Sequence, residues 1–182
     1  MQQFTKWTLE TMRSEGAMLS WLEESRFEWT TTVAQAVRQI IEGKTLVLIT
    51  DSERKWFARY ITTSFNRPSM ERPMIPMIRL EQMYPAYDEI TGGKMIDMLD
   101  DMLDLAFSEG YFFWYIGKGD DRRSDIAKRS DESLLWLMDE DFQNALTLRS
   151  YDPIVDIKLL QLYRLFDITL NSALFGEIDV DA

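Results

Sequence analysis

The sequence predicts a three-layer α/β fold, in which a doubly wound parallel sheet carries helices on both faces. Short, continuous apolar runs recur along the chain, and such runs are typical of strands buried on both faces. Helical stretches alternate with these runs, which is the pattern of parallel strands joined by crossover connections. No repeat, low-complexity tract or linker interrupts the 182 residues. We therefore expect a single domain over 1–182.

Residues 1–43 are predicted to form an N-terminal helical extension to the sheet. Apolar side chains recur at helical spacing between Val33 and Ile41, and Gly43 follows where a helix commonly ends. The first buried strand is expected at 45–50. Asp51 and the serine after it would then cap a helix that continues to about residue 65.

The α/β core, 44–150, is expected to contain four further strands. Pro76 falls within the first of these, so that strand should be an edge strand, contain a bulge or begin late. Residues 82–93 are expected to form a loop and residues 94–107 a helix. The four further strands are predicted at 74–80, 111–116, 134–138 and 145–148.

A long C-terminal helix is predicted over 152–176. Asp152 and Pro153 have the character of an N-cap followed by a first-turn proline, and Gly176 is typical of a helix end. The helix is apolar on nearly all sides, which is more apolar surface than one sheet face can cover. It is either a central core helix or it packs against a second subunit, and we favour the second interpretation.

The composition argues against catalysis and against nucleic acid as a direct partner. The chain contains no histidine and no cysteine, which excludes Ser-His-Asp and Cys-His nucleophiles, the usual zinc sites and disulfides. A net charge of −11 repels phosphate backbones. No apolar run is long enough to cross a bilayer. We expect a cytoplasmic protein that has no enzymatic activity, no cofactor, no metal and no membrane partner.

Three short motifs have features of ligand sites. Residues 50–53 (TDSE) follow the first strand but lack glycine and place two carboxylates where a phosphate would bind, so a helix cap is favoured. Residues 117–119 (GKG) are interpreted as an ordinary turn. Residues 100–104 (DDMLD) have the spacing of a diphosphate-Mg²⁺ motif, but a solvated helix face opposite Met95, Met98, Leu99 and Met102 is favoured.

The end of the last helix offers one candidate binding site. Leu174 and Phe175 are two large apolar residues at the point where the helix runs out. They either complete the core or, if exposed, anchor a partner helix. Their spacing does not distinguish these interpretations.

Several segments resemble the HobA family, whose members bind the bacterial replication initiator DnaA. The similarity covers most of the chain and includes several tryptophans, which are rare residues. The segments that carry it are 20–23 (SWLE), 46–57 (LVLITDSERKWF), 71–73 (ERP), 113–114 (FW), 116–118 (IGK), 134–137 (LLWL) and 156–166 (DIKLLQLYRLF).

A more distant resemblance links the chain to the DnaA-associating DiaA family and to sugar-isomerase (SIS) domains. Residues 71–78 (ERPMIPMI) are similar to the E-R-P-x-x-P-x-I stretch of DiaA, and 171–175 (NSALF) to its N-x-x-L-F ending. Together these resemblances imply a flavodoxin-like SIS fold, a homotetramer and no enzymatic activity. They also imply binding to the N-terminal domain of DnaA, promotion of its assembly at the chromosomal origin, and contacts to DnaA from Leu174 and Phe175.

The alternative function is that of a phosphosugar-binding SIS isomerase or sensor. Such a protein would bind its ligand near Thr50, Ser52 and Lys118. SIS enzymes carry a loop rich in glycine, serine and threonine after the first strand, whereas this chain has TDSE there. This difference disfavours binding of a sugar phosphate, because the two carboxylates of TDSE lie where the phosphate would bind.

Overall fold

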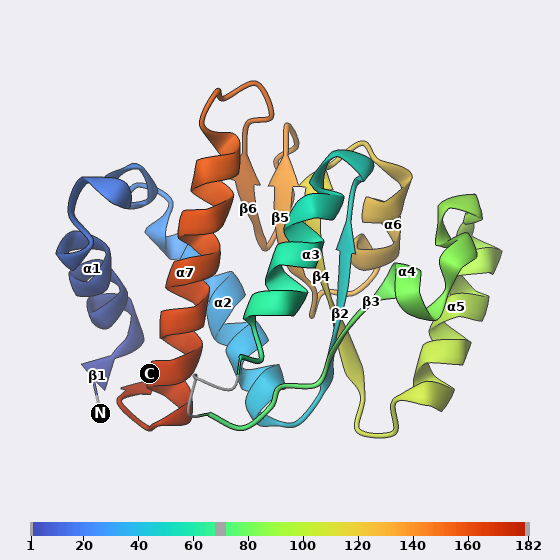
Figure 1. Cartoon of the computed structure of the whole chain (residues 1–182), viewed down its shortest axis with the longest axis horizontal. Helices are drawn as coiled ribbons and strands as arrows, with labels where there is room; N and C mark the ends of the chain where they lie inside the picture. Colours follow the sequence, from blue (N-terminus) through green and yellow to red (C-terminus); the bar gives the residue numbers. More distant parts are fainter. Residues whose placement is uncertain (1, 68–71, 181–182) are drawn as a thin grey trace.

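The computed structural model describes residues 2–67 and 72–180, in which five parallel strands form one central sheet (Figure 1). The strand order is β3-β2-β4-β5-β6, and every neighbouring pair is parallel. Counted along the chain, this is the flavodoxin-like order 2-1-3-4-5. The predicted doubly wound parallel sheet is confirmed. Its strands are β2 (Thr45–Thr50), β3 (Met77–Arg79), β4 (Tyr111–Lys118), β5 (Leu134–Met138) and β6 (Ala145–Leu148).

The larger core lies on the sheet face that α2, α3 and α7 cover (Figure 1). Alternate strand residues point to this face, as the two-residue period of a strand requires. Trp114 and Trp136 from the sheet and Trp29 from α2 are fully buried there. The helix α1 packs against α2. The bounds are α1 (Phe4–Ser14), α2 (Arg26–Ile41), α3 (Lys55–Ser64) and α7 (Val155–Leu174), with the short 3-10 helices η1 (Gly16–Met18) and η2 (Ser20–Leu22) between α1 and α2.

A second, smaller core lies on the opposite face. Val47, Phe113 and Leu135, from three neighbouring strands, pack there against residues of α5 and α6. Both faces are therefore covered, which explains why the strands have continuous apolar sequences. The elements on this side are α4 (Leu80–Met83), η5 (Pro85–Glu89), α5 (Gly93–Ala106) and α6 (Arg122–Lys128).

The region around β3 agrees with the prediction in part. This strand is an edge strand and begins only after Pro76, whose carbonyl accepts a hydrogen bond from Leu46 of β2 (3.0 Å). Both a late start and an edge position are therefore observed. The loop predicted over 82–93 is wrong in part, because α4 ends within it and η5 occupies 85–89. Pro85 opens η5, since a proline at a first helical position loses no intrahelical hydrogen bond.

The two ends of the chain pair with each other. Gln2–Gln3 (β1) and Ile178–Asp179 (β7) form a two-stranded parallel sheet, so the helical extension predicted over 1–43 is wrong at Gln2–Gln3. No local sequence signal marks so short a pairing, which depends on the two ends being brought together by the fold. The pairing ties the segment after α7 to the start of α1.

The C-terminal helix starts later than predicted. Asp152 caps a preceding turn, because its side chain accepts a hydrogen bond from the backbone of Ile154 (3.0 Å). Lys158 holds the other carboxylate oxygen of Asp152 at 2.6 Å. The helix ends at Leu174, and Gly176 adopts φ +73°, as expected of a helix-terminating glycine.

Candidate functional site

The carboxyl ends of β2 and β4 form the position at which doubly wound sheets usually bind ligands. The strand order reverses between these neighbours, which opens a crevice beyond their ends. Thr50 ends β2 and is buried, and Asp51 leads from it into the 3-10 helix η3 (Ser52–Arg54) and then α3. The residues predicted near a sugar phosphate therefore lie at the expected edge of the sheet.

The side chain of Asp51 closes this crevice. It is 2% exposed and accepts hydrogen bonds from the backbone N–H of Arg54 (2.9 Å), from the guanidinium of Arg54 (3.0 Å) and from the backbone N–H of Lys118 (2.8 Å). The predicted cap is thus confirmed, with Asp51 as the capping residue. Donors that a phosphate would need are already bound to a carboxylate of the same chain.

The charged groups around the crevice are also paired with one another. Lys118 donates to Glu53 (2.9 Å), and Arg54 contacts the second oxygen of Glu53 at 2.6 Å. The hydrogen bond from Lys118 holds the pKa of Glu53 below its usual 4.5, with the charge of Arg54 as the next cause. An incoming anion would meet two carboxylates whose compensating cations are engaged.

Gly117 permits this close packing. Its φ is +157°, and a Cβ at this position would lie 2.7 Å from the carboxyl carbon of Asp51. The expectation that residues 117–119 form an ordinary turn is wrong in part, because Gly117 and Lys118 are the last residues of β4. The glycine serves the approach of a carboxylate, not of a phosphate.

The neighbouring loop is filled in a similar way. The ammonium of Lys128 donates to the carbonyl of Gly119 (2.6 Å) and to Glu140 (2.7 Å). Ser124 donates to the same carbonyl at 2.7 Å. Polar groups beyond β4 and β5 are thus satisfied within the chain.

The acidic helix α5 does not form a metal centre. Asp97 pairs with Arg129, and Asp100 accepts a hydrogen bond from Tyr111 (3.3 Å). Within 2–67 and 72–180, no three acidic side chains are grouped so that they could hold a metal ion. Met98 is exposed, so its predicted place on the buried face is wrong, whereas Leu99 is buried as predicted. The other buried residues of the helix are Ile96 and Leu103.

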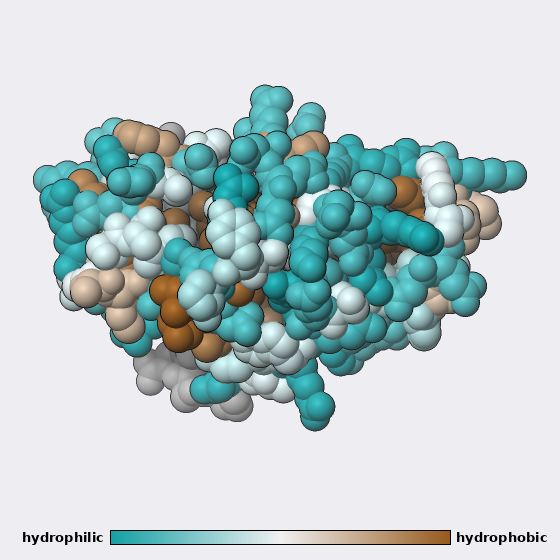
Figure 2. Space-filling view, turned by 90° about the horizontal axis from the view of Figure 1, so that it is seen from above, coloured by the Kyte–Doolittle hydropathy of each residue, from teal (hydrophilic) through white to brown (hydrophobic). Residues whose placement is uncertain are grey.

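The outer face of α7 differs from the strand ends, because its exposed side chains are apolar. Ile157 and Leu160 are 53% and 37% exposed, and together with Met18 of η1 and Tyr60 of α3 they line a groove of about 510 Å³, called here the α7 groove. Figure 2 shows a hydrophobic area, coloured brown, on the half of the molecule that contains α7. Trp56 and Ile154, one helical turn before Tyr60 and Ile157, add exposed apolar surface.

One end of the α7 groove lies beside a buried ion pair. The guanidinium of Arg72 contacts Asp167 (2.8 Å), donates to Asn171 (2.7 Å) and lies over the ring of Phe65. Burial raises the pKa of Asp167, although Arg72 opposes that shift. The pair joins the ERP segment to α7; Glu71 of that segment lies outside the described residues.

The structure separates the two candidate residues at the end of α7. Leu174 is partly buried and packs against the main core. Phe175, the next residue, is 58% exposed. One residue thus supports the helix end, and the other presents an aromatic ring to solvent.

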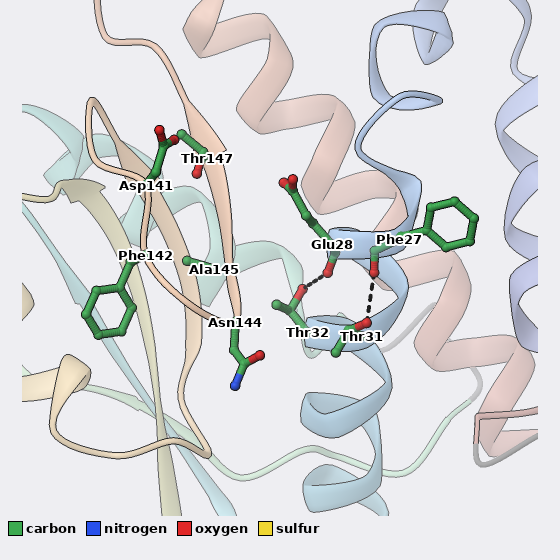
Figure 3. Close-up of a pocket in the computed structure, with 9 residues that line it drawn as sticks. All are labelled: Phe27, Glu28, Thr31, Thr32, Asp141, Phe142, Asn144, Ala145 and Thr147. Carbon is green, nitrogen blue, oxygen red and sulfur yellow. Dashed lines mark hydrogen bonds between the residues drawn. The ribbon is translucent and has the colours of Figure 1, made fainter.

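Another groove, of about 410 Å³, lies between the start of α2 and the edge strand β6 (Figure 3). Thr31 and Thr32 line it, but their hydroxyls donate to the carbonyls of Phe27 (2.9 Å) and Glu28 (2.8 Å) in their own helix. These hydroxyls are satisfied without a ligand.

Sequence reasoning missed both grooves. Met18 and Tyr60 are far apart in the sequence, and neither belongs to a recognisable motif. Only the excess apolar surface of the C-terminal helix indicated that part of it would remain uncovered.

Comparisons with known proteins agree along the whole chain. The family model described as "HobA: DNA replication regulator" matches residues 1–180. The DNA replication regulator protein HobA of Helicobacter pylori is 30% identical over 186 residues, covering 98% of this chain and 99% of the relative.

Solved structures give the same result. Crystal structures of Helicobacter pylori HobA and of a HobA-DnaA (domain I-II) complex each match with a TM-score of 0.75 and 27% identity. Each match covers 98% of this chain and 99% of the other. Within the described part of the chain, no helix has the length and apolarity needed to span a bilayer. The chain belongs to the HobA family of DNA replication regulators.

Proposed function

We propose that this chain is a non-catalytic adaptor that binds the N-terminal domain of DnaA and promotes assembly of the initiator at the chromosomal origin. The observation that carries the proposal is the similarity, over 98% of this chain, to the HobA chain of the HobA-DnaA (domain I-II) complex. A sequence identity of 27% together with a TM-score of 0.75 supports a shared surface as well as a shared fold.

The closed strand ends support the non-catalytic part of the proposal. The crevice that would hold a substrate is filled by Asp51, whose three hydrogen bonds all come from this chain. Histidine and cysteine are absent from the sequence. No observation favours the phosphosugar isomerase or sensor, because an anion at Thr50, Ser52 and Lys118 would displace the Lys118–Glu53 ion pair and face the carboxylate of Asp51.

We further propose that residues 1–182 act as one domain that assembles into a cytoplasmic homotetramer without touching DNA. One continuous core cluster joins α1, the sheet and α7, which supports a single unit. The net charge of −11 disfavours direct contact with DNA. A tetramer that binds several DnaA molecules raises their effective concentration to the order of millimolar without new chemistry.

Phe175 is the residue proposed to contact DnaA directly, with Leu174 beside it. An exposed aromatic ring at a helix end has the character of a binding hot spot. Leu174 packs on the core below and holds the end of the helix in place.

Size-exclusion chromatography with light scattering tests the proposal. We expect the full chain to elute as a tetramer and to form a larger complex when DnaA domains I and II are added. A tetramer whose mass is unchanged by DnaA would refute the adaptor function.

A further inference from the structure

We infer that the groove between α2 and β6, called here the β6 groove, binds an extended and positively charged segment of a partner protein, which adds to the sheet beside β6. The inference goes beyond the proposed function and does not depend on it. The residues that line this groove include neither Leu174 nor Phe175, the proposed contacts to DnaA.

The strand β6 is an edge strand, and half of its backbone groups face away from the sheet. The carbonyl of Leu148 accepts a hydrogen bond from Asp139, the residue after β5 (3.0 Å). Because the backbone groups of a strand point alternately to its two sides, Leu146 and Leu148 bond to β5, whereas Ala145 and Thr147 point outward. The N–H of Thr147 and the carbonyls of Ala145 and Thr147 therefore face the open edge.

This edge lacks the protection that the opposite edge of the sheet has. At that edge, Pro76 precedes β3, and Arg79 gives the strand a charge. The strand β6 reads ALTL and contains neither a proline nor a charged residue. An open edge without these features is suited to pair with another extended chain, and peptide-binding proteins use such edges for strand addition.

The β6 groove provides space beside this edge (Figure 3). Its volume is about 410 Å³. Glu28, Thr31 and Thr32 of α2 lie on one side of it, and Asp141, Asn144 and Thr147 lie on the other. Because β6 has four residues, an added segment would follow the edge for about 13 Å. The two threonine hydroxyls of α2 are satisfied in their own helix, so the edge backbone is left to recognise the segment.

The charges around the groove identify the chemistry of the occupant. Glu28 is exposed and has no ion-pair partner among the residues that the structure describes. The side chain of Asp141 is 80% exposed, and its contact with Arg149 is long, at 3.7 Å. Lysine or arginine side chains of an added segment would pair with these carboxylates. A second copy of the same edge would bring the same carboxylates together, and a nucleic acid would be repelled.

A matched pair of variants at Thr147 tests strand addition. Thr147→Pro removes the outward N–H without removing a hydrogen bond of the sheet, whereas Thr147→Val keeps that N–H. The probe is a short capped peptide of alternating lysine and valine, and fluorescence anisotropy measures its binding to the full chain. We expect Thr147→Pro to raise the dissociation constant about 10-fold or more and Thr147→Val to change it by about twofold or less. Equal affinities of the two variants, or no saturable binding to the wild type, would overturn the inference.

A modified peptide separates hydrogen bonding from simple attraction between opposite charges. The same lysine-valine peptide, N-methylated at every residue, keeps its charge but has no backbone donors. We expect it not to bind. Binding equal to that of the unmodified peptide would show that charge alone attracts the probe and would overturn strand addition.

A second pair of variants tests the charges of the groove at constant net charge. Glu28→Gln combined with Asp141→Asn removes both groove carboxylates, and Asp101→Asn combined with Asp104→Asn removes two exposed carboxylates of α5. We expect the first combination to weaken binding of the unmodified peptide about 5-fold or more and the second to leave it nearly unchanged. Equal effects of the two combinations would contradict a basic segment in the groove.

Hydrogen exchange in the wild type tests the site without any substitution. The amide of Thr147 faces solvent, so it should exchange rapidly in the free protein and about 10-fold or more slowly with saturating peptide. Nuclear magnetic resonance measures this rate, and circular dichroism verifies that the variants above are folded. An amide of Thr147 whose exchange is unaffected by bound peptide would overturn the assignment of the edge.

Discussion

The strand ends at β2 and β4 and the outer face of α7 differ in how their side chains are satisfied. At the strand ends, Asp51 has three internal hydrogen-bond donors, and Glu53 has two internal cations. On α7, Ile157 and Leu160 remain exposed to solvent. At the strand ends, where this fold usually binds ligands, the polar side chains find their partners within the chain. The side chains that remain uncovered lie on α7 and are apolar. Such a molecule is organised to bind other proteins.

The largest expected effect comes from opening the strand ends. Asp51→Ala leaves the buried guanidinium of Arg54 without its main carboxylate, so the free energy of unfolding should fall by about 3–5 kcal/mol. Glu53→Ala, which removes an exposed partner of the same arginine, should cost about 1 kcal/mol or less. Urea denaturation measures both. Equal losses in the two variants would show that the crevice is not a closed, buried network.

Gly117→Ala tests the close approach of Asp51. The added methyl group would lie 2.7 Å from the carboxyl carbon, so we expect a loss of about 2–3 kcal/mol in the free energy of unfolding. Gly43→Ala is the control, because Gly43 also has a positive φ (+87°) but no atom within 4 Å of the added Cβ. Its cost should be about 1 kcal/mol of backbone strain. A smaller loss for Gly117→Ala than for the control would contradict the proposed packing.

The end of α7 allows core support to be separated from partner binding. Leu174→Ala should lower the free energy of unfolding by about 1–2 kcal/mol, because the side chain packs partly buried on the core. Phe175→Ala should change it by about 0.5 kcal/mol or less but weaken DnaA binding by about 2 kcal/mol or more. Thermal unfolding and calorimetry measure the two quantities. Unchanged DnaA binding in Phe175→Ala would remove this residue from the contact surface.

The smallest expected effect is a pH dependence at the strand ends. The folded pKa of Glu53 is lowered below 4.5, so its ion pairs add stability that is present above 4.5 and lost as the pH falls through the folded pKa. Glu53→Gln should therefore melt slightly below the wild type at neutral pH. The two melting temperatures should converge in acid. A difference in melting temperature that widens as the pH falls would contradict the lowered pKa of Glu53.

The sheet was predictable from the sequence because each buried strand has its own local signal. The runs at 45–50 and 134–138 are apolar and β-branched or leucine-rich, and both appear with the predicted bounds. The β1–β7 pairing was not predictable, because two residues at each end carry no pattern. Local signals specify elements, whereas contacts between distant segments specify how the elements meet.

The candidate sites follow the same rule. Absence of glycine in TDSE predicted that the strand end would reject a phosphate, and the structure adds the hydrogen bonds to Asp51 that close it. The α7 groove needed Met18 and Tyr60 from separate elements, so its shape could not be derived from the helix alone. The exposure of Phe175 beside the partly buried Leu174 also required the three-dimensional packing.

The most direct test of the central claim is a calorimetric titration of DnaA domains I and II into the full wild-type chain. We predict saturable binding without any added ligand or metal, because Phe175, the proposed contact residue, is already exposed and the strand ends are closed by Asp51. A titration without binding heat, repeated at a second temperature to exclude an accidental zero in the enthalpy, would contradict the account of this chain as a DnaA-binding adaptor.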